Sequence, residues 1–218
     1  SKFKFYCQYG SVNSSGRIVT YGYWDYYQPQ NGKRCYISTA GCTPTSFAMI
    51  LESLGYSTTP TAVSRANRRI TDPFNINENI GCRDTQPRPG TSWEDIYYSG
   101  GVRDWVRSLG YTMTGDLTGS DMSLTTLQAL DIYIKRGCFV VAGANVRYAR
   151  GSGLIDAPGG HAFAITGVNV ANRSVTAYDP TFCRPPYIGG ERTFTNVTSF
   201  GTGTSSVNGW IFASAICR

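Results

Sequence analysis

The chain has 218 residues, a formal net charge of +6, only 16% charged residues, and 25 glycines and 15 tyrosines. This length suits one catalytic domain over residues 1–218, and the composition excludes both a disordered chain and a helical bundle. No apolar run approaches the roughly 18 residues that cross a bilayer, so we expect no membrane span.

The positive charge does not indicate a nucleic-acid partner. Lysines and arginines are scattered, and the densest spots are Lys33-Arg34 and Arg68-Arg69. No zinc-finger, RNA-recognition or helix-turn-helix signature accompanies them, so they are typical of a solvated face. Ser1 is followed by polar and aromatic residues instead of a signal peptide, and we therefore expect a mature, processed form.

The first clear helix begins near residue 43. Residues 1–41 are rich in Tyr, Gly, Ser and Asn and predict strands and loops. Apolar residues then recur at three- and four-residue spacing up to Leu54, Pro44 suits a first helical turn, and Gly55 ends the run. This pattern places Cys42 at a helix N-terminus.

Further helices and then strands follow in chain order. The sequence predicts helices over about 60–69, 101–109 and 121–136, with Asp121 capping the last, and a loop region over 71–97. It predicts strands over 138–144, 162–168, 175–178 and 210–216. We therefore expect an α+β fold in which a helical half packs against an antiparallel sheet half, with a cleft between them.

The seven cysteines favour disulfides over metal binding. They form no C-x-x-C pair and there is one histidine, so we expect neither a metal site nor a cofactor. Disulfides indicate a secreted, extracellular protein, and the odd count leaves one thiol over. If Cys42 is that thiol, the other six can pair in 15 ways, among which Cys7 with Cys35 is suggested only by proximity.

Cys42 and His161 are candidates for nucleophilic catalysis. The positive end of a helix dipole lowers the pKa of a thiol and favours the reactive thiolate. A thiolate nucleophile needs a partner that exchanges a proton near neutral pH, and His161 is the only histidine. Taken singly, Cys42 could be a buried or disulfide-bonded residue and His161 a structural one.

A carboxylate is expected beside His161, because an imidazole needs a hydrogen-bond partner that fixes its tautomer. Asp179 ends the strand after the one that His161 opens, and a hairpin through residues 169–172 would bring the two together. Asp156 and Asn169 are less well placed alternatives. By itself, Asp179-Pro180 is an ordinary turn starter.

In combination these segments resemble a known family. The segments 41–46 (GCTPTS), 160–168 (GHAFAITGV) and 178–180 (YDP) are similar to the three motifs of papain-clan cysteine peptidases related to the leader-cleaving domains of bacteriocin exporters. The motifs occur in the same order, and the resemblance covers roughly residues 24–183. No transporter part accompanies them, so the exporter role is not carried over.

The resemblance implies a papain-like fold and a role for each motif residue. Cys42 would be the nucleophile, His161 the general base and then acid, and Asp179 the orienting residue. It also implies an upstream glutamine whose amide joins the Cys42 N–H in an oxyanion hole; Gln28 is the first choice and Gln30 its competitor. The family usually has glycine after the nucleophile, where this chain has Thr43.

We therefore predict a secreted, monomeric cysteine endopeptidase that acts on a protein or peptide substrate through a thioester. The same triad also serves glutamine deamidases and transglutaminases, since a thioester made from a glutamine side chain can pass to water or to an amine. A secreted binding module that keeps the fold without turnover is the third hypothesis.

Overall fold

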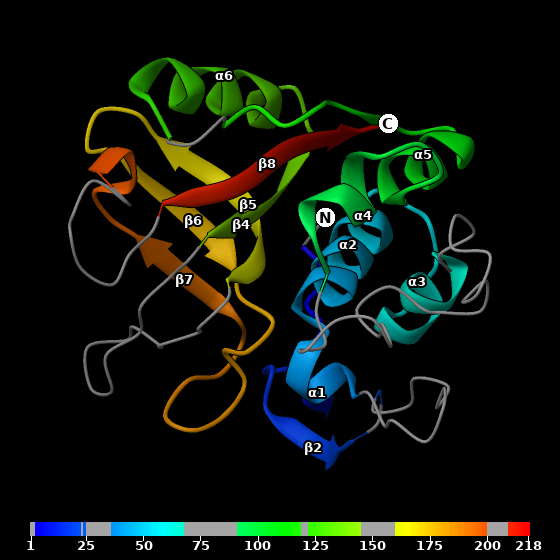
Figure 1. Ribbon diagram of the computed structural model, residues 1–218. Coiled ribbons are helices and arrows are strands. Elements are labelled where there is room, and N and C mark those ends of the chain that lie inside the picture. Colours follow the sequence, from blue (N-terminus) through cyan, green and yellow to red (C-terminus); the bar gives the residue numbers. More distant parts are fainter. Residues whose placement is uncertain are drawn as a thin grey trace.

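The computed structural model describes residues 3–22, 24, 36–67, 91–118, 122–144, 160–199 and 209–218. Its centre is a six-stranded antiparallel sheet with the strand order β3-β8-β4-β5-β6-β7 (Figure 1). The strands are β3 (Thr112–Met113), β4 (Phe139–Ala144), β5 (His161–Asn169), β6 (Ser174–Tyr178), β7 (Glu191–Phe194) and β8 (Trp210–Cys217).

Helices pack on both faces of this sheet. Leu127 and Leu130 of α6 (Leu124–Lys135) pack in one core with Val140 and Ala142, whereas α2 (Cys42–Ser53) packs in a second core with Val141. Because successive strand residues point to opposite faces, the two helices cover opposite sides of β4. Figure 1 shows α2 and α6 on different sides of the sheet.

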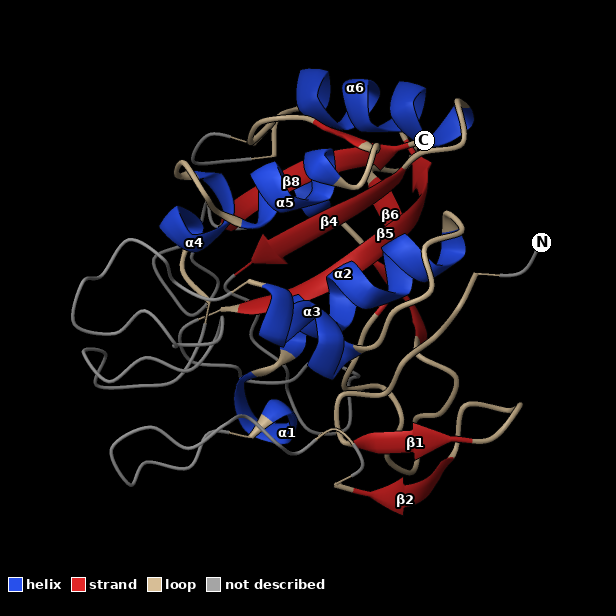
Figure 2. Ribbon diagram, turned by 90° about the vertical axis from the view of Figure 1, so that its right-hand side faces the viewer, coloured by secondary structure: helices blue, strands red, loops and turns tan. Residues whose placement is uncertain are grey.

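The remaining helices gather on the α2 side, where the two views show them in front of the sheet or beside it (Figures 1 and 2). They are α1 (Ile37–Ala40), α3 (Pro60–Ala66), α4 (Trp93–Tyr97) and α5 (Val102–Ser108). The short 3-10 helix η1 (Val197–Ser199) follows β7 in the chain, and its Val197 packs in the core that contains α6. A separate hairpin of β1 (Gly10–Val12) and β2 (Ile18–Tyr21) lies near α1. The expectation of an α+β fold with an antiparallel sheet is confirmed, although α6 packs against the sheet's second face.

Several local predictions need correction. Residues 93–97 form α4 instead of a loop, because Ser92 and Asp95 make a reciprocal capping box. The helix predicted over 121–136 begins at Leu124 and is capped by Ser123, whose hydroxyl accepts from the Thr126 N–H, while Asp121 lies outside the described residues. The short helix α1 was not predicted.

Within the described residues, two disulfides join distant parts of the chain. Cys138 bonds Cys217 across β4 and β8, and Cys7 bonds Cys183 over 176 residues of sequence. Pairing of Cys7 with Cys35 by proximity is therefore wrong. Cys35 lies outside the described residues, as does Cys82.

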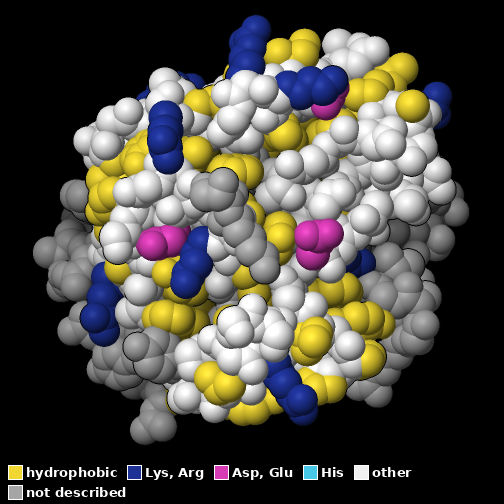
Figure 3. All heavy atoms as spheres, turned by 180° about the vertical axis from the view of Figure 1, so that it is seen from behind, with side chains coloured by type: hydrophobic (Ala, Val, Ile, Leu, Met, Phe, Trp, Pro, Cys, Tyr) yellow, Lys and Arg dark blue, Asp and Glu magenta, His cyan; other side chains and the backbone are white. Residues whose placement is uncertain are grey.

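The described surface agrees with the scattered charge of the sequence. Figure 3, which shows the molecule from behind, has its Lys and Arg side chains spread singly over that face. In the described part of the chain no helix has the length and apolar character that a membrane crossing requires.

Candidate active site

Cys42 is the first residue of α2, immediately after α1. Gly41 joins the two helices, and its N–H donates to the carbonyl of Ile37 at 2.8 Å. A Cβ at Gly41 would lie 2.4 Å from Ile37 Cγ2, so the turn requires a residue without a side chain. The close approach of α1 thus fixes the Cys42 thiol at the positive end of the α2 dipole.

His161 opens β5 and is buried, with 6% of its surface exposed. Gly160 precedes it with φ +100°, a backbone conformation that glycine adopts readily. The pairing of His161 with Ala144 holds the residue at the end of β4. The pairing of β4 with β5 therefore holds the backbone that carries the imidazole ring.

Asp179 follows β6 and is completely buried. The hairpin of β5 and β6 pairs Ala164 with Tyr178, which brings the next residue alongside His161. Asp179 Oδ1 lies 2.7 Å from His161 Nε2, so the predicted hairpin and its contact are present. Of the two alternatives, Asn169 lies at the far end of β5 and Asp156 lies outside the described residues.

The thiol of Cys42 is the only free one among the described cysteines and is partly exposed. It makes hydrogen bonds with His161, with the backbone N–H of Ala162 and with the side chain of Thr43. Burial raises the pKa of Cys42, but these hydrogen bonds and the charge of His161 outweigh it, so the net pKa is lowered. Thr43, which stands where the family usually has glycine, therefore contacts the thiol.

Charges along this row of groups stabilise one another. Burial lowers the pKa of His161, but the carboxylate of Asp179 and the Cys42 thiolate more than reverse this and raise it to about 10. Burial acts on Asp179 in the opposite sense, and His161 followed by Arg192 holds the pKa of that carboxyl well below its usual range. Both pKa shifts favour the ion pair, a Cys42 thiolate beside a His161 imidazolium, over the neutral thiol and imidazole.

Three further hydrogen bonds hold Asp179. Thr181 donates its N–H at 2.9 Å and its hydroxyl at 2.7 Å to Oδ1, and Arg192 Nη1 donates to Oδ2 at 3.0 Å. Sequence reasoning missed Arg192, which lies on β7, a strand that was not predicted. Arginine in a short polar strand carries no local signal of its partner.

The N-terminal segment is attached to the loop that carries Asp179. The backbone N–H of Gln8 donates to the Pro180 carbonyl at 2.8 Å, and the neighbouring Cys7 is disulfide-bonded to Cys183. The side-chain amide of Gln8 donates to Ser38 in α1 at 3.2 Å. One segment therefore braces both the aspartate loop and the helix that precedes Cys42.

Both glutamines proposed for the oxyanion hole, Gln28 and Gln30, lie outside the described residues. Across the described ranges no cluster of three or more His, Cys, Asp or Glu side chains could hold a metal ion. The thiol of Cys42 and the imidazole of His161, which are hydrogen-bonded to each other, can perform nucleophilic attack by sulfur and proton transfer.

A thiol at a helix N-terminus, hydrogen-bonded to an imidazole that a buried carboxylate orients, is the arrangement that papain-clan cysteine peptidases use. Comparison with family models agrees, because the model of the Peptidase_C39 like family matches residues 25–185, about three quarters of the chain. The chain belongs to this family, whose members are related to cysteine peptidases.

Among solved structures, one that matches is described as a C39-like peptidase from Bacillus anthracis. It shares 15% sequence identity with this chain, the match covers 82% of this chain and 88% of that one, and the TM-score is 0.49. Among curated proteins, none matches this chain.

Proposed function

We propose that this protein is a secreted cysteine endopeptidase in which Cys42 is the nucleophile, His161 the general base and acid, and Asp179 the residue that orients His161. The observation that carries the proposal is the continuous row of contacts from the Cys42 thiol through His161 to the 2.7 Å hydrogen bond with buried Asp179. Membership of a peptidase-like family supports peptide-bond hydrolysis as the reaction.

In the acylation step, the Cys42 thiolate attacks the carbonyl carbon of a peptide bond and a C–S bond forms. The carbonyl electrons move to oxygen, where the backbone N–H of Cys42 and an upstream glutamine, with Gln28 the first choice, would donate hydrogen bonds. As the tetrahedral intermediate collapses, the imidazolium of His161 gives its proton to the leaving amine. The first product is a new N-terminus and the enzyme is left as a thioester.

In the deacylation step, neutral His161 takes a proton from water and hydroxide adds to the thioester carbon. Collapse breaks the C–S bond, releases the carboxylic acid product and returns the thiolate–imidazolium pair. The Asp179 hydrogen bond to Nε2 leaves Nδ1 as the ring nitrogen for Cys42, so one tautomer serves both steps.

Secretion is proposed because of the disulfides. Cys7–Cys183 and Cys138–Cys217 persist in oxidising compartments, while the cytosol keeps thiols reduced. Cys7 and Cys183 are fully buried, so mild reductant would keep Cys42 reactive and leave that bond intact.

The test measures cleavage of internally quenched peptides and of unfolded protein substrates by the wild-type chain and by Cys42→Ala and His161→Ala. We expect wild-type cleavage, with both variants slower by at least about 10³, because triad members act as a unit. Mass spectrometry of the products distinguishes the activities: cleaved peptides support the proposal, and intact substrate that has lost ammonia indicates a deamidase. Unchanged cleavage by Cys42→Ala would refute the assignment.

A further inference from the structure

We infer that Arg192 is a positioning residue of this site, which holds Asp179 ionised and correctly directed and thereby sets the pH range over which Cys42 is a thiolate. The inference rests on the proposed function, because it assigns a role within the same row of groups. Arg192 lies outside residues 25–185, the part of this chain that the family model matches.

The contacts of Arg192 restrain its guanidinium from three directions. Its Nη1 donates to Asp179 Oδ2 at 3.0 Å, and its side chain is only 7% exposed. The guanidinium carbon lies 4.2 Å from the ring centre of Phe182 and 4.1 Å from that of Phe194. Two aromatic faces therefore hold the cation in place, and a flexible surface ion pair does not have this geometry.

The two carboxylate oxygens of Asp179 contact different cationic groups. Oδ1 faces His161 and accepts from Thr181, while Oδ2 accepts from Arg192. With both oxygens bonded, Asp179 cannot rotate without breaking a buried charged hydrogen bond. This arrangement fixes the orientation of the Asp179 carboxylate toward the imidazole. A single His–Asp contact would define that orientation less well.

Arg192 also completes the balance of buried charge. In the reactive state Cys42 and Asp179 are negative, whereas His161 and Arg192 are positive, so the row of four groups is neutral. Without Arg192 the buried row would carry a net negative charge, which is costly to desolvate. The arginine therefore favours the state in which the thiol has lost its proton.

Other titratable groups face this row. Tyr9 is close enough for the charges of Asp179 and Cys42 to affect it, and Arg184 stacks over the Tyr9 ring at 3.8 Å. Burial raises the pKa of Tyr9 above its ordinary 10.0, so its phenol is neutral from acid to neutral pH. Glu191 is turned to the hydroxyl of Tyr178 at 3.1 Å. Arg184 and Glu191 are exposed, and solvent screens them more than it screens Arg192.

The test compares wild type with Arg192→Gln and Arg192→Lys in the rate of Cys42 alkylation by iodoacetamide between pH 4 and 11. Removing a positive charge raises the proton affinity of every nearby group. A unit charge on the order of 10 Å away, at an effective dielectric of about 20, changes a pKa by roughly one unit. We therefore expect the acid limb of Arg192→Gln to move up by about one pH unit.

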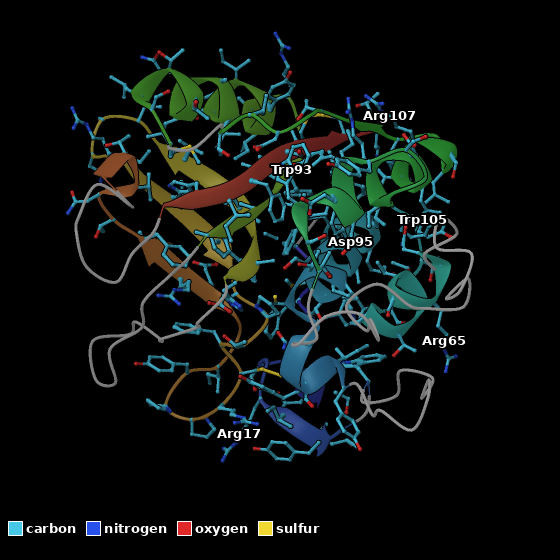
Figure 4. The ribbon with its side chains drawn as sticks, in the orientation of Figure 1. Arg17, Arg65, Trp93, Asp95, Trp105 and Arg107 are labelled. Atoms are coloured by element: carbon cyan, nitrogen blue, oxygen red, sulfur yellow. A yellow bond between two sulfur atoms is a disulfide. The ribbon has the colours of Figure 1, made fainter. Side chains whose placement is uncertain are left out.

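Arg192→Lys keeps the charge but removes the planar guanidinium. We expect its acid limb to stay near that of wild type, while its plateau alkylation rate falls because Asp179 is less well fixed. The control is Arg107→Gln, which makes the same change in net charge on α5, beside β3 at the opposite edge of the sheet from β7; Figure 4 labels this exposed side chain. We expect no change from it.

A second readout follows the ionisation of His161 directly. Because the chain has one histidine, its ¹⁵N ring signals report His161 alone. The histidine titration of Arg192→Gln should also move to higher pH. If the acid limb of Cys42 alkylation lies at the same pH in wild type and in a folded Arg192→Gln, the inference is overturned. If Arg192→Gln does not fold, the inference is overturned by an Arg192→Lys variant whose acid limb and plateau alkylation rate both equal those of wild type. If wild-type Cys42 shows no lowered pKa, the proposed function itself fails.

Discussion

Replacing Asp179 by asparagine removes the negative charge that faces His161 and leaves a side chain of similar shape. Burial lowers the pKa of His161, and Asp179 is the largest of the influences that raise it to about 10 from its ordinary 6.5. This span of about 3.5 units corresponds to about 5 kcal/mol of stabilisation of the imidazolium, which Asp179 shares with the Cys42 thiolate. We expect kcat/KM at pH 7 to fall by about 10² to 10⁴.

The assay is cleavage of a fluorogenic peptide from pH 5 to 10, with the alkylation rate of Cys42 measured in parallel. Asp179→Asn also leaves Arg192 buried beside a neutral amide, so the unfolding free energy of each variant must be measured as well. Asp131→Asn is the matched control, because it removes a carboxylate that pairs with exposed Lys135 on α6 at 2.8 Å. That variant should retain wild-type activity.

A folded Asp179→Asn variant with kcat/KM within a few-fold of wild type and an unchanged histidine titration would contradict this role of Asp179. Such an outcome would mean that Asp179 is a structural residue of the loop after β6. A lowered kcat/KM with an unchanged histidine pKa would attribute the loss to orientation of the ring instead of its charge.

Two further predictions concern the backbone before Cys42 and the proton balance of the site. Gly41→Ala should destabilise the fold by about 1 to 3 kcal/mol and slow Cys42 alkylation, because its Cβ would lie 2.4 Å from Ile37 Cγ2. Gly115→Ala, whose Cβ meets only Arg103 at 3.8 Å, is the control in denaturant unfolding. Folding raises the pKa of His161 and lowers that of Cys42, so the two groups have opposite effects on how the unfolding free energy varies above pH 6.5, and the wild type should lose less stability there than Cys42→Ala. In Cys42→Ala only the raised His161 pKa remains, so stability should be full below pH 6.5 and fall above it by up to about 1.4 kcal/mol per unit; a flat profile would contradict this.

The elements with a strong local pattern were predictable from the sequence. The three- and four-residue spacing that ends at Leu54 predicted α2, and Cys42 stands at its start. The strands β4, β5, β6 and β8 agree with the predicted ranges to within one or two residues. In these elements the apolar residues that give the local pattern are also the ones that the core buries, so local pattern and tertiary packing favour the same secondary structure.

The local reasoning failed where a few polar side chains decide the structure. The capping box of Ser92 and Asp95 makes a helix of only five residues, too short for its apolar spacing to register. For the last helix, Ser123 caps the terminus that Asp121 was expected to cap. Several residues near a helix terminus can serve as its cap. The sequence therefore limits the candidate capping residues but does not decide which one caps the helix.

The chemical groups available for the site could be read from the amino-acid sequence alone: one histidine, an odd number of cysteines, a cysteine before a helix and an aspartate after a strand. Which of these groups contact one another depends on the tertiary fold. The 2.7 Å His161–Asp179 contact depends on a hairpin register, the Cys7–Cys183 bond closes 176 residues, and the Arg192–Asp179 bond depends on β7 pairing with β6. Contacts between residues far apart in sequence leave no local periodicity, because they form only when separate elements pack together.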